Sequence, residues 1–374
     1  MKFTKALIVG TILTVTMVSA QTVTAKTLKF ANPMPVSNQQ GWSETVKPFG
    51  EAIEARTDGK LKLKAYHSGA LIKFADTPDA MEVGMADLAY FSTMFSPAYF
   101  PSWLFGGVLD PTTSPRNPLE GIMIASIMYD EFPSFGEELA KKNMFPLIHN
   151  ATSLLSMISN VEVPDMAALE GKRMRIFAGE FHAELTKLQH ASPVMTPWPE
   201  VYESLEKGIV DCMVTVTTGM NDLKLAEVAK YLYLMKVNED SHWVAPMNAS
   251  YLTGFNLNTF KKLPVDQRVI ILEEAKKAES QYARDCATKW VPKAISEMEA
   301  SGMKVTAWAP SEVAKWGKIA QSVYKMAEDK MNEKGLPGTK MVARYQELTA
   351  LDSGKLAELY DKAWNNRIEW AKSL

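Results

Sequence analysis

The sequence predicts an α/β protein made of two similarly built lobes. The stretch 169–217 contains a short apolar strand at 173–177, helical segments, and a second apolar strand that starts at Ile209 after a glycine stop at Gly208. Strands alternating with helices are typical of α/β domains. The region 27–66 follows the same pattern, with strands at both of its ends and a helix between them.

A short motif occurs twice and indicates that the two lobes resemble each other. Residues 81–87 and 205–211 both read apolar, Glu, any residue, Gly, two further residues and Asp, and an apolar strand follows each. Near the N-terminus, strands at 27–31 and 61–66 flank a helix at 43–56. Such a unit predicts a right-handed crossover between parallel strands.

The remaining elements follow from periodicity, proline and glycine. We expect the longest helix to start at 263–266, to carry an apolar stripe from Ile271 to Cys286 and to break near Pro292. Further strands are expected at 87–92, 145–150, 154–160, 250–258 and 303–307, and further helices at 77–84, 121–129, 136–142, 222–234 and from Pro310 onward.

Composition excludes some classes of protein and suggests export. The chain has 374 residues and a formal net charge of -2, without the basic patch that nucleic-acid binding requires. Lys2 and Lys5 flank an apolar run, 6–18, that is too short to span a bilayer. We expect residues 1–25 to be a cleavable signal peptide, with cleavage after Ala20 or Ala25. The chain would then be periplasmic and not membrane-spanning, although an uncleaved anchor is the alternative.

No residue pattern indicates catalysis, a metal or a cofactor. The five histidines show no ligand spacing with one another or with cysteine, and phosphate loops, nucleophile elbows and dinucleotide fingerprints are absent from the sequence. Cys212 and Cys286 fall on apolar positions, so we expect buried structural thiols. The sequence therefore favours a binding protein over an enzyme, with no metal site and no cofactor.

Arg175 is the main candidate for ligand binding. It stands between apolar neighbours in the predicted strand, and a buried guanidinium needs a partner because it stays protonated. Either an internal carboxylate such as Glu200 or Asp211 pairs with it, or a bound carboxylate does. The aromatic loop 95–118 either covers a pocket or closes the edge of the core.

Several motifs resemble the substrate-binding proteins of tripartite ATP-independent periplasmic (TRAP) transporters. In chain order these are TLKFANPMP, YHSGAL, DAMEVGMADLAYFS, LEGKRMRI, VMTPWPEVYESLEKGIVD and LPVDQRVIILEEA. The resemblance implies a two-lobe periplasmic binding protein fold with hinge strands and a long helix crossing both lobes. It also implies an organic acid ligand that is delivered to membrane permease subunits. On this basis lobe I would comprise 26–150 and 236–276, and lobe II 151–235 and 277–374.

The resemblance assigns the carboxylate-binding arginine to Arg175 and the proline–tryptophan turn to Pro197–Trp198. The chain departs from the family at two places. Thr215 stands where the family often has a ligand-contacting asparagine, beside the apolar Met213 and Val214, and Ser156 stands where some members have a second arginine. An apolar site disfavours ligands with many hydroxyl or amide groups.

We therefore expect a relatively apolar monocarboxylate with an aromatic, alicyclic or aliphatic body. Three alternatives remain: an exported hydrolase or lyase acting on a carboxylate, an ABC-type receptor, and a purely structural exported protein. The expected ligand-binding residues are Arg175, Trp198, Thr215, Phe177, Asn150, Ser92, Trp243 and Tyr99.

Overall fold

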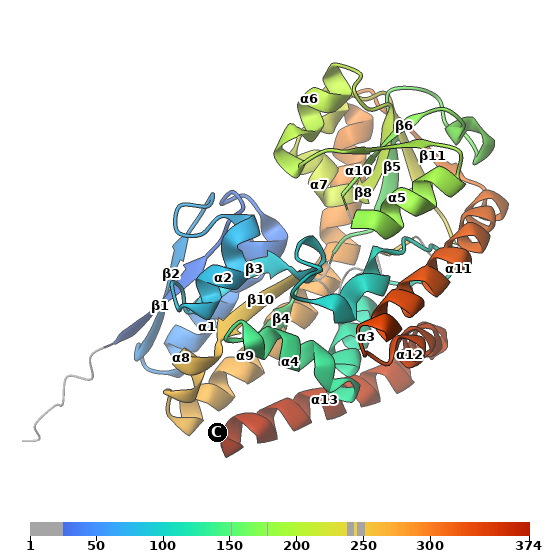
Figure 1. The fold of residues 1–374 in the computed structure, drawn as a ribbon. Coiled ribbons are helices and arrows are strands. Elements are labelled where there is room, and N and C mark those ends of the chain that lie inside the picture. The colour runs from blue at the N-terminus through green and yellow to red at the C-terminus, as the bar shows by residue number, and fades with distance from the viewer. Residues whose placement is uncertain (1–24, 151, 178, 238–242, 245–250) are drawn as a thin grey trace, which may run out of the picture.

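Two β-sheets, each covered by helices, form the two lobes of the molecule (Figure 1). The structure is a computed structural model that describes residues 25–150, 152–177, 179–237, 243–244 and 251–374. The predicted two-lobe α/β architecture is confirmed. The expected signal peptide lies almost entirely outside the described residues, which begin at residue 25.

Lobe I is built on a five-stranded sheet with the order β2-β1-β3-β10-β4. Its strands are β1 (Lys26–Ala31), β2 (Leu61–Tyr66), β3 (Leu88–Ser92), β4 (Met144–His149) and β10 (Tyr251–Asn256). Its helices are α1 (Val46–Arg56), α2 (Thr77–Glu82), α3 (Pro118–Glu131), α4 (Pro133–Lys141), α8 (Leu257–Lys261) and α9 (Val265–Asp285), with a 3-10 segment η4 (Pro101–Gly107). Strand β1 pairs in parallel with β2 and β3, as the predicted crossover requires, whereas β10 runs antiparallel to β3 and β4.

Lobe II is built on a six-stranded sheet with the order β11-β9-β5-β8-β6-β7. Its strands are β5 (Leu155–Ser159), β6 (Arg173–Ile176), β7 (Ser192–Met195), β8 (Cys212–Val216), β9 (Tyr231–Met235) and β11 (Lys304–Trp308). Its helices are α5 (Gly179–Leu188), α6 (Val201–Glu206), α7 (Thr217–Asp222) and α10 (Val291–Ala300). Strand β6 is parallel to β7 and β8, and β5 is antiparallel to β8 and β9.

Apolar sequence patterns explain how the helices cover these sheets. Every residue of β3 and β4 is buried. Strand β3 is an inner strand, and β4, although it ends the sheet, is covered by α3, α4 and α9. Helix α1 buries Val46, Phe49 and Ile53, which recur at spacings of three and four and so form one face. The core is thus set largely by the periodicity that predicted the elements.

The lobes are joined by strand segments and by one long helical crossing. Leu154 bridges Val244, and the Leu155 amide donates to the Trp243 carbonyl at 2.8 Å, so two connecting segments run side by side. Helix α9 packs in lobe I, continues through a π-helical segment at Cys286–Trp290, and becomes α10, which packs on α7 and β11 of lobe II. The predicted break near Pro292 is therefore this π-helical segment, and the helix does not end there.

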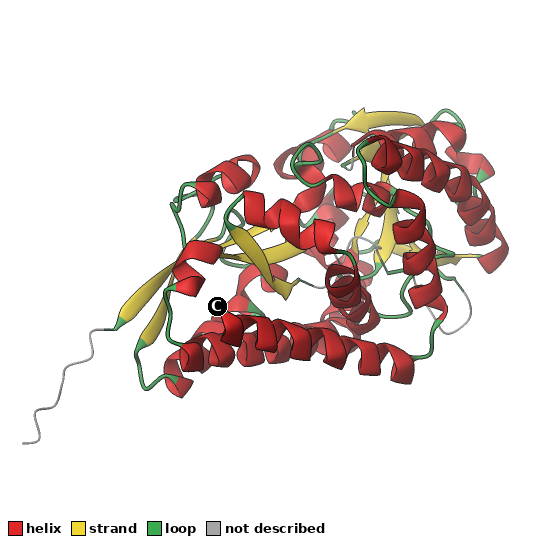
Figure 2. Ribbon diagram, turned by 60° about the horizontal axis from the view of Figure 1, so that its bottom comes forward, coloured by secondary structure: helices red, strands yellow, loops and turns green. Residues whose placement is uncertain are grey.

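The C-terminal helices are shared between the lobes. They are α11 (Pro310–Glu333), α12 (Gly338–Ala350) and α13 (Ser353–Ser373). Helix α11 contacts α5 of lobe II and η4 of lobe I, whereas α13 packs on α3 and α9 and runs along one side of the molecule (Figure 2). Buried Glu279 of α9 accepts hydrogen bonds from Tyr360 at 2.7 Å and Trp364 at 3.0 Å of α13. The expectation that 277–374 belongs to lobe II therefore does not describe α13.

Three sequence expectations about elements are wrong. The helix expected at 222–234 is absent, because α7 ends at Asp222 and residues Tyr231–Met235 form the inner strand β9. Their alternating Tyr and Leu side chains suit a strand between two others. Helix α11, with 24 residues, is longer than α9, with 21. No strand was predicted between the two helical segments of 169–217, but Ser192–Met195 form β7, an edge strand that tolerates Pro193.

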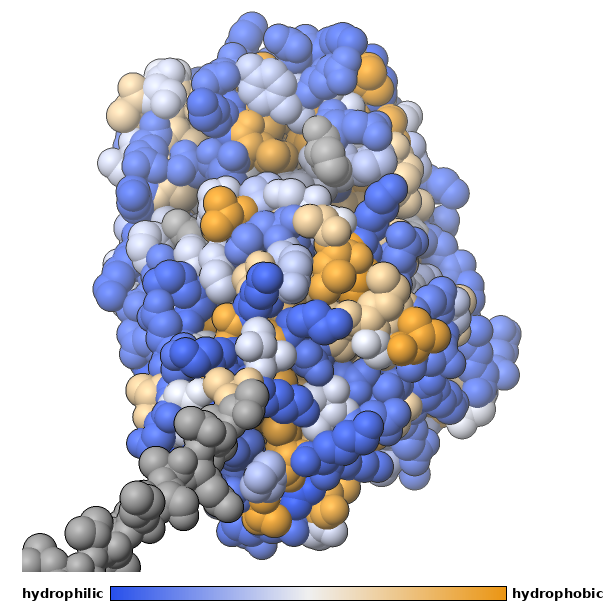
Figure 3. All heavy atoms as spheres, turned by 90° about the vertical axis from the view of Figure 1, so that its left-hand side faces the viewer, coloured by the Kyte–Doolittle hydropathy of each residue, from blue (hydrophilic) through white to orange (hydrophobic). Residues whose placement is uncertain are grey.

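The face of the molecule seen in Figure 3 is mostly hydrophilic. On the face seen in Figure 3, apolar residues form small groups among polar ones. None of the helices in the described part of the chain is long and apolar enough to cross a membrane.

Candidate functional site

Arg175 is a buried cation in the sheet of lobe II. It lies on β6 with Val194 of β7 and Met213 of β8 as its register partners, and only 3% of its surface is exposed. Its Nε donates a hydrogen bond to the Thr196 carbonyl at 3.0 Å. Among the described residues no carboxylate forms an ion pair with it. Asp211, one of the expected internal partners, instead pairs with Arg173 at 2.6 Å.

Two aromatic rings hold the Arg175 side chain. The guanidinium carbon lies 5.0 Å from the centre of the Phe177 ring and 5.6 Å from that of Trp198. Contacts of a cation with aromatic faces are attractive, particularly away from water. Trp198 is fixed in turn by Gly219, since a methyl group at that glycine would lie 3.1 Å from the indole. The expected residues Arg175, Phe177 and Trp198 therefore form one group.

Burial sets the electrostatics of this group. It lowers the pKa of Arg175 to about 10, so the side chain stays charged at neutral pH. Burial and the neighbouring Arg175 charge lower the pKa of His182 to about 3, so that imidazole is neutral. A buried cation without a counter-ion is unfavourable, and a bound anion would remove that penalty.

Tyr251 approaches Arg175 from the other lobe. It is the first residue of β10, and burial raises the pKa of its phenol to about 12 while the Arg175 charge opposes the rise. Its ring stacks on Tyr90 with 6.1 Å between centroids and meets Phe95 edge-on at 6.5 Å. Phe74 contacts both Tyr90 and Phe95. We call Phe74, Tyr90, Phe95 and Tyr251 the lobe I aromatic wall.

Thr215 lies on the same face of the lobe II sheet as Arg175. Arg175 is the register partner of Met213, and Thr215 follows Met213 by two residues, so all three side chains point to one face. Thr215 is 5% exposed and is paired in register with Ser156 of β5. The Ser156 hydroxyl is hydrogen-bonded to that of Thr217 at 2.9 Å. This face thus contains hydroxyl groups where some family members have a second arginine.

Ser92 and Asn150 occupy strand ends in lobe I. Ser92 closes β3 and is the register partner of Tyr251, which brings it to the edge of the aromatic wall. Asn150 follows β4, and its amide is used within the lobe. Its Nδ2 donates to the Gln40 carbonyl at 2.8 Å, and its Oδ1 accepts from Thr253 at 3.1 Å.

The structure places Tyr99 and Trp243 apart from Arg175. Tyr99 is 41% exposed, donates a hydrogen bond to Asp79, and lies beneath the Lys142 ammonium. Trp243 is fully buried and packs edge-on against Trp316 with 5.4 Å between centroids. Neither contacts any ring that holds Arg175.

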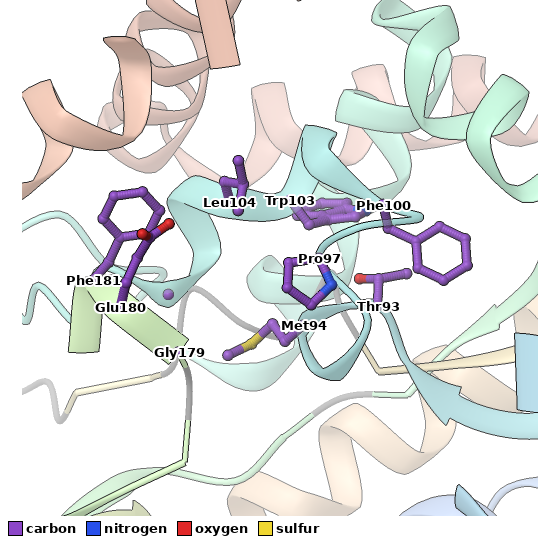
Figure 4. A pocket seen from close by; sticks show the side chains of 10 residues that line it. Thr93, Met94, Pro97, Phe100, Trp103, Leu104, Gly179, Glu180 and Phe181 are labelled. Atoms are coloured by element: carbon purple, nitrogen blue, oxygen red, sulfur yellow. The ribbon is translucent and has the colours of Figure 1, made fainter. Parts of the chain in front are cut away.

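The aromatic loop both closes the core and lines a small pocket between the lobes. Phe100, Trp103 and Phe105 are buried, and the Trp103 indole donates to the Tyr129 hydroxyl at 3.0 Å. The pocket lies between η4 and the start of α5, and Figure 4 shows Trp103 and Leu104 on one side and Glu180 and Phe181 on the other. It does not include Arg175. The loop therefore both closes the edge of the core and lines a pocket, which the sequence had left as alternatives.

Both cysteines are buried and unpaired, as expected. Burial raises the pKa of Cys212 and of Cys286 to about 12, so neither forms a reactive thiolate at neutral pH. Within the described ranges, no group of three or more His, Cys, Asp or Glu side chains is placed to hold a metal ion.

Sequence reasoning missed Tyr251, Tyr90, Phe95 and His182. The tyrosines and the phenylalanine sit in or after apolar strands, where nothing local distinguishes a ligand-facing ring from a core ring. Buried His182 accepts a hydrogen bond from the Phe177 amide at 3.4 Å, and its Nε2 has no partner among the described residues. The pairing of β3 with β10 brings Tyr90 and Tyr251 together within lobe I, and the arrangement of the two lobes brings Tyr251 near Arg175.

Comparison with known proteins identifies the family. Residues 34–330 match the model of the bacterial extracellular solute-binding proteins, family 7. A solute-binding protein of Roseobacter denitrificans is 23% identical over 294 residues, covering 76% of this chain and 81% of the relative. The C4-dicarboxylate-binding periplasmic protein of Shewanella loihica is 26% identical over 189 residues, covering 50% and 52% respectively.

Solved structures agree with the fold described above. A marine metagenome TRAP solute-binding protein specific for aromatic acid ligands, in complex with 3-hydroxybenzoate, superposes with a TM-score of 0.74 at 19% identity, covering 87% of this chain and 98% of that one. A TRAP solute-binding protein from Rhodoferax ferrireducens with copurified benzoate gives 0.73 at 17% identity, covering 90% and 99%. These relatives are receptors and not enzymes. The chain therefore belongs to the bacterial extracellular solute-binding proteins of family 7, which serve TRAP transporters.

Proposed function

We propose that this TRAP solute-binding protein captures a relatively apolar monocarboxylate on Arg175. The observation that carries the proposal is the buried guanidinium, which has no ion-pair partner among the described residues. Its Nε donates a hydrogen bond to the Thr196 carbonyl, and the Phe177 and Trp198 rings contact the guanidinium. These contacts hold the two terminal nitrogens of the guanidinium in place. A planar guanidinium held in this way suits a carboxylate with two parallel hydrogen bonds.

The surroundings of Arg175 support an apolar ligand body. Met213 lies on the same face of the sheet as Arg175 and is fully buried, and Phe177 and Trp198 flank the cation. Ligand hydroxyl or amide groups placed against such side chains would lose their hydrogen bonds to water without replacement. Acidic ligands are also named for structural relatives, including 3-hydroxybenzoate, benzoate and galacturonate. The feature that these three share is the carboxylate.

Delivery to a membrane permease and export of the chain complete the proposal. Proteins of this family hand their ligand to TRAP permease subunits, and we infer the same partners for this chain. We also propose that residues 1–25 direct export and are removed, leaving a periplasmic protein that starts near Lys26. The alternatives of an exported hydrolase or lyase and of an ABC-type receptor lack support, because the family and structural relatives are TRAP receptors.

Isothermal titration of the chain from Lys26 onward tests the role of Arg175. The ligands are benzoate, cyclohexanecarboxylate, hexanoate and, as a highly polar acid, N-acetylneuraminate. Arg175→Ala should weaken binding of the apolar acids by about 100-fold or more, because a buried charge pair contributes roughly 3 kcal/mol. Arg173→Ala is the matched control. That arginine lies two residues away on the same strand but is bound to Asp211 at the surface, so its removal should leave affinity within about threefold.

Two results would contradict the proposal. Equal affinities of the wild-type protein and Arg175→Ala for every acid would show that Arg175 does not bind the carboxylate. Tight binding of N-acetylneuraminate with no binding of the apolar acids would leave the carboxylate site in place but reject the apolar ligand class.

A further inference from the structure

The lobe I aromatic wall offers a partly exposed surface of aromatic rings near Arg175. Phe95 is 43% exposed although it is a large apolar side chain, and Tyr251 beside it is only partly buried. Tyr90 behind them is 2% exposed. Isolated exposed phenylalanines are common, but this one is the accessible edge of a set of mutually contacting rings. An exposed aromatic surface near a cation that has no ion-pair partner among the described residues is suited to an aromatic anion.

The wall is held rigidly from behind. The Tyr90 hydroxyl donates to Gln40 Oε1 at 3.1 Å, and the Gln40 amide donates to the Asn150 carbonyl at 2.9 Å. Gly41 allows the loop to approach closely, since a methyl group there would lie 3.0 Å from the Tyr90 ring. Because this ring cannot move freely, the position of Tyr251 stacked on it is also restricted.

The hydroxyl of Tyr251 is available for a ligand. It forms no hydrogen bond with any other described residue, although it lies in electrostatic range of Arg175. A phenol is already protonated at neutral pH, and burial raises the pKa of this one further, so it can donate a hydrogen bond. A donor on lobe I and a cation on lobe II can therefore both bind one carboxylate.

We propose that the ligand is an aromatic monocarboxylate whose ring lies against Phe95 and Tyr251 and whose carboxylate bridges Arg175 and the Tyr251 hydroxyl. This inference rests on the proposed function and narrows it, because it selects the aromatic acids from the apolar ones. It assigns Tyr251 as a specificity-determining residue that couples ligand binding to contact between the lobes. Ring-on-ring contacts favour an aromatic over a saturated ring of the same size.

Titrations with benzoate and cyclohexanecarboxylate test this inference. Both acids have one carboxylate and are similar in size, but only benzoate has an aromatic ring. The wild-type protein should bind benzoate about threefold to tenfold more tightly. Tyr251→Phe keeps the ring and removes the donor, so both acids should weaken by about tenfold while their ratio is preserved. Phe95→Leu keeps an apolar side chain and removes the ring, so the ratio should fall toward one. Tyr99→Phe, a tyrosine bonded to Asp79 on the outer surface, should change neither value.

The outcomes separate this inference from the function on which it rests. If both acids bind through Arg175 without preference for benzoate, or if Tyr251→Phe binds both as the wild type does, the inference is wrong and the proposed function stands. If only an open-chain acid such as hexanoate binds through Arg175, the aromatic class is likewise rejected. If binding of every acid is unaffected by Arg175→Ala, both proposals fail. A retained melting temperature in Tyr251→Phe excludes misfolding as a cause of weaker binding.

Discussion

The two sheets of this protein repeat one arrangement of strands. Reading from one edge, lobe I has the order β2-β1-β3-β10-β4 and lobe II has β7-β6-β8-β5-β9, with β11 added at the end. In each lobe, the first three strands in this order are parallel and the fourth is antiparallel to both of its neighbours. In each lobe the fourth strand directly follows a connection from the other lobe.

The repeated sequence motif marks equivalent positions in these sheets. Asp87 accepts a hydrogen bond from the Lys29 amide at 2.8 Å, and Asp211 accepts one from the Arg173 amide at 2.8 Å. Each aspartate amide also donates back to the carbonyl of the same residue, at 2.9 Å and 2.8 Å. The glycine three residues earlier has a positive φ in both lobes. The motif therefore joins the start of β3 to β1 in lobe I and the start of β8 to β6 in lobe II.

The functional difference lies two residues beyond this shared device. Two residues after Lys29 stands Ala31, which is buried and apolar, whereas two residues after Arg173 stands Arg175. Lobe I instead presents rings, with Tyr90 and Tyr251 on its paired strands. The same framework thus provides a cation on one side and an apolar wall on the other. A common backbone arrangement leaves the ligand chemistry to individual side chains.

Replacing Arg175 with Met should make lobe II more like lobe I. Of the substitutions that compare the two lobes, it should have the largest effect on ligand binding and stability. Ligand-induced stabilisation should disappear, while the ligand-free protein should become more stable by about 1 to 3 kcal/mol, because an unpaired buried charge is replaced by an apolar group of similar size. Thermal unfolding with and without benzoate measures both effects. A lower melting temperature of the ligand-free variant would show that Arg175 has a structural role without a counterpart in lobe I.

Removing the two aspartates tests whether they are equivalent. Asp87→Ala and Asp211→Ala should each lower the free energy of unfolding by about 2 kcal/mol, since each leaves a strand amide without its acceptor. The Asp211 pair with Arg173 adds little, because the arginine side chain is half-exposed. Urea denaturation measures both variants. A severalfold larger loss for one of them would mean that the motif has different roles in the two lobes.

Replacing the glycine of the motif in each lobe should give the smallest loss of stability. Gly84 has φ +77° and Gly208 φ +63°, and no atom lies within 4 Å of the position of an added methyl group at either. Gly84→Ala and Gly208→Ala should therefore each cost about 1 kcal/mol from backbone strain alone. A substantially greater loss at either position, in the same denaturation experiment, would indicate a contact that the other lobe lacks.

Local pattern was sufficient for most of the fold but for only part of the site. The strands of the N-terminal crossover and the crossing helix follow from periodicity, because each buries one regular face. Arg175, Phe177 and Trp198 could be grouped because they are close in sequence to a single strand and the turn after it. Tyr251 could not, because its place among the lobe I rings depends on pairing between β3 and β10, which are about 160 residues apart in the chain, and its approach to Arg175 depends on how the two lobes are placed. The inner strand β9 was misread as a helix because its burial comes from neighbours distant in sequence.

Helix α13 has a consequence for the order in which the chain can fold. Helix α13 packs on lobe I, which also contains β1, and its Tyr360 and Trp364 donate two hydrogen bonds to the buried Glu279 carboxylate, to which the His149 amide donates another. Until those residues are synthesised, that carboxylate lacks two donors and the surfaces of α3 and α9 beneath α13 remain uncovered. Contacts of such sequence separation form slowly. The lobe that contains β1 can therefore bury these surfaces only after α13 has been synthesised.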